Sequence, residues 1–136
     1  MHDRFVRAVD RVHMALDGVP AGDVHDDLAA VADRLARLVE DVFAACARAQ
    51  AAAPSDRAEV PGGDDGRYLD AHRALSRAAT LTAQVSEAMT MARVELSAPP
   101  DDVDHAAARR YVPAAARAAD AAADLVGQAS RLVRPT

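Results

Sequence analysis

The five histidines are the residues best suited to chemistry near neutral pH, because imidazole both exchanges protons and binds divalent metals. Three of them, His13, His25 and His105, fall beside predicted helix ends that an up-down helical arrangement brings to one pole. Aspartates crowd the same pole, at Asp17, Asp23, Asp26, Asp27, Asp101, Asp102 and Asp104. Imidazole and carboxylate together can hold a divalent cation, so these histidines are a candidate metal- or pH-responsive site. The alternative is that these side chains are plain helix caps, since no HxxxH, HExxH or ExxH motif occurs.

A second candidate pairs the single cysteine, Cys46, with His72. Cys46 falls near the end of the second predicted helix and His72 near the start of the third, so both belong to the opposite pole. A neighbouring imidazole can convert a thiol into a thiolate nucleophile. Cys46 also lies beside an apolar stripe, where a free cysteine more often packs as a small hydrophobic residue, and no third orienting residue is evident.

Arg67 and His72 are separated by four residues, in the stretch Arg67-Tyr68-Leu69-Asp70-Ala71-His72. This spacing resembles the Arg-x4-His motif of HEPN-type ribonucleases, which are small helical bundles that dimerise. The resemblance is confined to residues 67–72 of a chain of 136 residues. It implies that Arg67 and His72 of each protomer would cleave RNA at a cleft between the protomers. Ala74 stands where that family often has a tyrosine, and the family's motif usually falls later in the chain.

The elements that position these residues are predicted to be helices, because apolar residues recur at alternating spacings of three and four. Glycine and proline interrupt the pattern at 18–22, 54–66 and Pro99-Pro100. The sequence therefore predicts helices at about 3–17, 23–53, 67–97 and 101–133, with a flexible loop at 54–66. The resulting fold is all-α: one domain over 1–136, an antiparallel up-down bundle of one short and three long helices.

Carboxylates at helix starts complete this prediction, since they accept hydrogen bonds from the free backbone N–H groups there. Asp23 is expected to cap the second helix, and Asp101 or Asp102 the fourth. Pro113 is expected to kink the fourth helix near Arg109, because proline removes a hydrogen bond from a helix interior.

The first helix is predicted to be about 22 Å long and the others about 45 Å, so it covers only half of the groove between them. The uncovered half is predicted to be lined by Val39, Val42, Phe43 and Cys46. Large exposed apolar patches are rare on monomers, so we expect a second copy of the chain to cover this stripe as a homodimer. A different protein or a small apolar ligand is the alternative occupant.

Composition and charge limit the classes of function. The chain weighs 14.3 kDa, is 51% apolar and only 3% aromatic, and is dominated by alanine, which argues for a single helical domain and against a sheet protein. It contains no Lys, Ile or Asn, a bias typical of a high-GC bacterial genome. The net charge of −5 and the lack of a basic segment make nucleic acid an unlikely partner.

One cysteine permits no internal disulfide, and the first residues lack the apolar core of a signal peptide, so we expect a cytoplasmic location. No apolar stretch is long enough to span a membrane. The sequence thus favours a non-enzymatic helical bundle without a cofactor that acts by self-association, with an adaptor or regulatory role toward another protein. The alternatives are a HEPN-like ribonuclease using Arg67 and His72, and a metal- or pH-responsive bundle using His13, His25 and His105.

Overall fold

The computed structural model describes residues 1–52 and 66–135, and every regular element in these ranges is helical. The elements are α1 (His2–Asp17), α2 (Asp23–Ala52), α3 (Arg67–Leu96), the short 3-10 helix η2 (Pro100–Asp102), α4 (His105–Arg109) and α5 (Tyr111–Leu132). The all-α prediction is confirmed, and the first three helices begin and end within one residue of their predicted bounds. Of the predicted loop 54–66, all but Gly66 lies outside the described residues.

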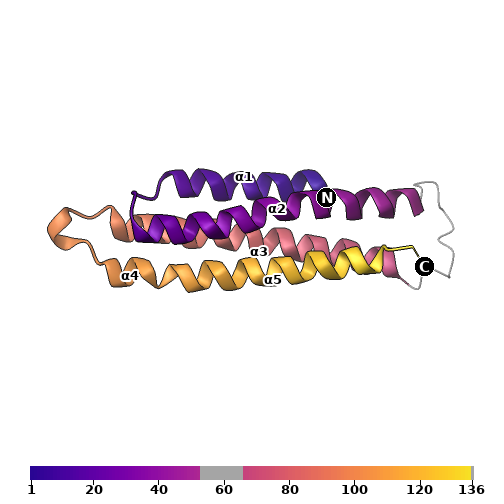
Figure 1. The fold of residues 1–136 in the computed structure, drawn as a ribbon. Helices are drawn as coiled ribbons and strands as arrows, with labels where there is room; N and C mark the ends of the chain where they lie inside the picture. The colour runs from indigo at the N-terminus through magenta and orange to yellow at the C-terminus, as the bar shows by residue number, and fades with distance from the viewer. Residues whose placement is uncertain (53–65, 136) are drawn as a thin grey trace.

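The helices α1, α2, α3 and α5 lie side by side along the length of the molecule, and α1 is visibly the shortest (Figure 1). The turn between α1 and α2 and the segment between α3 and α4 lie at the same end of the molecule (Figure 1). Helix α3 packs most extensively against α5 and then against α1, whereas α2 packs against α5 and α1 and touches α3 only slightly. The space between α2 and α3 is therefore filled by α1 on one side and by α5 on the other.

On α1, α2 and α3 the buried side chains follow the helical spacing of the sequence. Its largest fully buried side chains include Phe5 on α1, Leu28 and Leu35 on α2, and Met89 on α3. Fully buried alanines occur along the packed faces of α3 and α5, and such small side chains let helix axes approach closely: Ala78, Ala92, Ala115, Ala122 and Ala129. The hydroxyl of Thr82, also fully buried, donates to the Ala78 carbonyl oxygen at 2.8 Å, so it is not left without a partner.

The prediction of one continuous helix over 101–133 is wrong. Pro100 opens the 3-10 helix η2, and Val103 then has an extended backbone with ψ of 124°, so α4 begins only at His105. Asp104, and not Asp101 or Asp102, caps it, because the Asp104 side chain accepts a hydrogen bond from the Ala107 N–H at 2.9 Å.

A second interruption separates α4 from α5 at Arg110. The residue responsible is Pro113, which has no N–H to donate to the carbonyl of Arg109 and whose ring crowds that carbonyl. The interruption falls next to Arg109, where the sequence predicts a kink. At the start of α2 the expected capping role of Asp23 is wrong, because Asp23 is itself the first helical residue and follows Gly22, whose φ of 148° favours glycine.

We expect Asp104→Ala to lower the free energy of unfolding by about 1 kcal/mol, since it leaves an N–H in the first turn of α4 without its partner. Asp101→Ala is the matched control, because Asp101 is exposed and precedes α4, and its effect should stay within about 0.5 kcal/mol. Urea unfolding followed by circular dichroism measures both. If both variants lowered the free energy of unfolding equally, the assignment of Asp104 as the capping residue of α4 would be contradicted.

Candidate functional site

The first residues of α1 contact α2 and α3 part-way along the molecule, and beyond this point α1 no longer lies between those two helices (Figure 1). The His2 ring packs edge to face against the Phe43 ring of α2, with 5.1 Å between centroids. Close by, the Arg4 Nη1 atom donates to the Ser76 Oγ atom of α3 at 2.6 Å. Helix α1 therefore begins at this level, where Met1 and His2 border the part of α2 that follows Phe43 and Met1 borders the part of α3 that precedes Ser76, in agreement with the short first helix that the sequence predicts.

A cavity of about 310 Å³ opens between these two uncovered segments, and we name it the α2–α3 groove. It is lined by Met1, Ala45, Cys46, Ala49, Gln50, Tyr68, Ala71, His72 and Leu75. None of these side chains is a carboxylate or a guanidinium, in a chain of which 27% of the residues are charged. An adjoining hollow of about 450 Å³ includes Phe43, Ala47 and Ala51 and shares Cys46 and Gln50 with the groove. The result is a depression without carboxylate or guanidinium side chains, bordered by the N-terminal amino group of Met1 and by the rings of His2 and Phe43.

The four residues predicted to form an interface lie in different surroundings. Phe43 is 56% exposed, which is high for an aromatic side chain, while Cys46 and Val39 are half-buried. Val42 is fully buried in the chain's own core, so its assignment to an uncovered surface is wrong. The reason is geometric: successive helix positions differ by about 100°, and Val42 faces inward where Phe43 faces outward.

The structure places Cys46 and His72 on the same cavity, as the sequence predicts. Burial raises the pKa of the Cys46 thiol, and the N-terminal amino group and a backbone hydrogen bond at His2 lower it by less. A raised pKa favours the neutral thiol, which is the opposite of the activation that a nucleophilic cysteine requires. In this environment Cys46 behaves as a small hydrophobic residue of the groove.

The pKa direction gives a prediction for alkylation by iodoacetamide. Because only the thiolate reacts, we expect native Cys46 to react more slowly at neutral pH than in the unfolded chain, with its rate rising at a higher pH. Mass spectrometry across a pH series measures this, with the protein in urea as the control. If the pH at which alkylation is half-maximal were lower in the native protein than in the unfolded chain, burial would not be the dominant influence on the pKa of Cys46.

Arg67 and His72 are not brought to one site within the chain. Arg67 lines a neighbouring cavity of about 440 Å³ that includes Arg48 and Val133 and shares Tyr68 with the α2–α3 groove. Its guanidinium lies 5.2 Å from the centre of the Tyr68 ring, and its Nη2 atom donates to the Tyr68 hydroxyl at 3.4 Å. His72 lies on the α2–α3 groove instead, since a separation of five residues turns a helix by roughly 140°.

His13, His25 and His105 are likewise not assembled. His13 Nδ1 lies 3.0 Å from the Val9 carbonyl oxygen of its own helix, and His25 Nδ1 lies 3.7 Å from Asp26 Oδ1. His105 lines a different cavity at the α4 end of the molecule. Within residues 1–52 and 66–135, no three His, Cys, Asp or Glu side chains are placed to hold one metal ion.

The sequence reasoning missed Tyr68, Ala49 and Ala71 as groove residues. Tyr68 precedes His72 by four positions, so their shared helix face was a usable signal. The alanines carry no such signal, because alanine is common throughout the chain and its helix propensity alone explains its presence.

Comparisons with protein-family models, with curated proteins and with solved structures find no match to this chain. In the part of the chain that the structure describes, no helix combines the length and the apolar character that crossing a bilayer requires. Arguments about function therefore rest on the geometry described above.

Proposed function

We propose that the chain is an antiparallel up-down helical bundle that acts by self-association, as a homodimer joined through the α2–α3 groove. The observation that carries this proposal is the groove without carboxylate or guanidinium side chains that α1 borders only at its start, beside the exposed ring of Phe43. In this proposal the dimer works in the cytoplasm as an adaptor or regulator of another protein and needs no catalytic group.

The patch is complementary to itself, which favours a second copy as its occupant. Phe43 projects beside a depression lined by small side chains, among them Ala47, Ala49 and Ala71. A two-fold axis close to Phe43 lets the ring of each protomer enter the depression of the other, as an isologous contact requires. Aromatic side chains are enriched and charges are depleted at the centres of such interfaces, and the groove has both properties.

The test is the absolute mass in solution, measured by light scattering over a concentration series around the micromolar range. We expect a mass of twice 14.3 kDa at the upper concentrations and dissociation on dilution. Alkylation of Cys46 supplies a local readout, because the thiol should become protected over the same concentration range. A monomer at every concentration would refute the proposal. A dimer with unchanged Cys46 reactivity would show that another surface forms the interface.

A further inference from the structure

We infer that a second cavity, at the end of the molecule where α4 lies, binds a free α-amino acid with an aliphatic side chain. The cavity measures about 500 Å³, within the range of small-molecule sites. Three segments distant in sequence line it: the turn and first residues of α2 over 20–24, the end of α3 and the following linker over 96–103, and α4 through His105 and Arg109.

The polar groups of the cavity are an open ion pair and an imidazole. Arg109 Nη2 lies 3.6 Å from Asp23 Oδ2, which is an ionic contact longer than a hydrogen bond. Both side chains are more than half exposed, so the pair contributes little to folding. Among residues 1–52 and 66–135, neither the Arg109 guanidinium nor the His105 ring makes a hydrogen bond, so their donors are available to a ligand.

The rest of the lining is apolar. Val24 is buried, Leu96 and Val103 are half-buried, and Pro20 and Pro100 add rigid hydrocarbon surface. The side chains beside the ion pair thus offer a surface for an aliphatic group of a few carbons. A cationic group, an anionic group and an apolar surface around one cavity are the three features that recognise an aliphatic α-amino acid.

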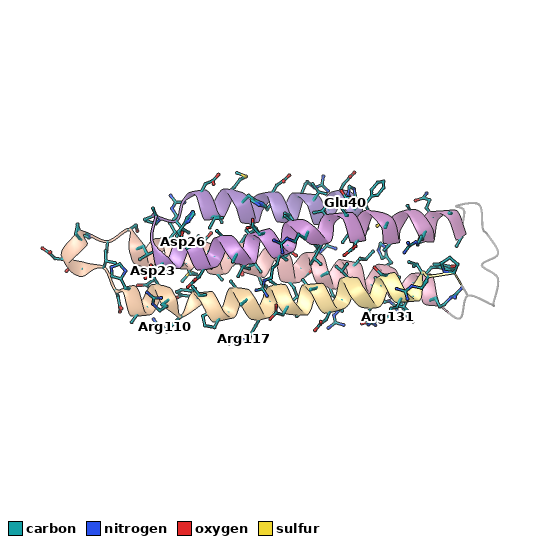
Figure 2. The ribbon with its side chains drawn as sticks, viewed as in Figure 1. Asp23, Asp26, Glu40, Arg110, Arg117 and Arg131 are labelled. Atoms are coloured by element: carbon teal, nitrogen blue, oxygen red, sulfur yellow. The ribbon has the colours of Figure 1, made fainter. Side chains whose placement is uncertain are left out.

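Electrostatics distinguishes a zwitterion from a simple ion. Asp26 lies on the same first turn of α2 as Asp23 (Figure 2), and Asp101, Asp102 and Asp104 lie in or beside the lining segment. A plain carboxylate would take Arg109 from Asp23 and leave that carboxylate among other negative charges. A plain amine would compete with Arg109 for the Asp23 carboxylate and would place two cations beside each other. An amino acid supplies a carboxylate to Arg109 and an ammonium group to Asp23, so both members of the ion pair gain a partner of opposite charge.

This site is independent of the proposed dimer, because no residue that lines it lines the α2–α3 groove. Its probe is L-leucine, titrated into the full chain by calorimetry. We expect leucinamide, which lacks the carboxylate, and 4-methylpentanoate, which lacks the ammonium group, each to bind about tenfold or more weakly. Glycine, which lacks the aliphatic group, should also bind more weakly.

Matched variants locate the site. Arg109→Ala and Asp23→Asn should each weaken leucine binding about tenfold or more, since each removes one charge-assisted contact. Arg110→Ala is the control, because Arg110 follows Arg109 directly at the same end of the molecule (Figure 2) and does not line the cavity. Circular dichroism establishes that each variant retains the helical content of the parent chain.

Two results would overturn the inference. The first is the absence of leucine binding at millimolar concentration by the parent chain. The second is binding that persists unchanged in Arg109→Ala, or that leucinamide reproduces in full, since either would show that Arg109 does not hold the ligand's carboxylate.

Discussion

Replacing Phe5 with alanine is expected to lower the free energy of unfolding by about 3–5 kcal/mol. Phe5 is fully buried, and it is the largest side chain that α1 contributes to the core. The substitution removes most of the ring's hydrophobic burial and leaves a cavity that α2 and α3 cannot close without moving. Since domains of this size are stable by about 5–15 kcal/mol, the loss is a large fraction of the total. Urea unfolding followed by circular dichroism measures it.

Met14→Ala is the matched control for this prediction. Met14 lies on the same helix but is 71% exposed, so its truncation should change stability by no more than about 0.5 kcal/mol. A Phe5→Ala protein as stable as Met14→Ala would show that α1 does not pack on α2 and α3 through Phe5. The same result would weaken the basis for placing the start of α1 beside Phe43.

The first three helices are predictable because their signals are local. In α1, Phe5, Val12 and Leu16 follow a helical period, and the same residues are buried in the structure. Within the long apolar stripe of α2, however, Val42 and Phe43 satisfy the period equally well. Which of the two faces the core depends on where α3 and α5 approach α2, and that information lies in other segments of the chain.

The predicted start of the fourth helix is wrong for a different reason. Asp101, Asp102 and Asp104 are equally suitable as capping residues by their chemistry. The backbone decides among them, because Pro100 begins a separate short turn and the chain must extend again at Val103 before α4 can start. Capping propensity alone cannot predict the start of α4, because it takes no account of the short helical turn that Pro100 begins just before it.

The pairing of Asp23 with Arg109 was also inaccessible to sequence reasoning. The two residues belong to α2 and α4, and no periodicity or motif connects them. His25 and His105 lie toward the same end of the molecule, but that end is wider than the coordination sphere of a metal ion. The sequence could indicate which residues share an end of the molecule, and only the packing of the helices could indicate which of them share a cavity.

Replacing Phe43 with aspartate is expected to weaken the proposed dimer on the order of a hundredfold or more. In the dimer the substitution would desolvate a carboxylate in a mostly apolar groove that has no arginine, and the N-terminal amino group and the His72 ring would offset part of that cost. In the monomer the same position is 56% exposed, so the carboxylate stays hydrated and the helix loses little. Light scattering at concentrations that keep the parent chain dimeric should give a mass near 14.3 kDa for the variant, with unchanged helicity.

Met14→Asp separates this effect from a general response to added charge. It makes the same apolar-to-acidic change at a position that is 71% exposed and remote from the groove, so the dimer should persist. Phe43→Leu completes the series, because an aliphatic side chain keeps part of the buried apolar area and should weaken the dimer far less than aspartate does. If Phe43→Asp and Met14→Asp dissociate the dimer equally, overall charge controls association. If neither does, the interface lies on a surface other than the α2–α3 groove.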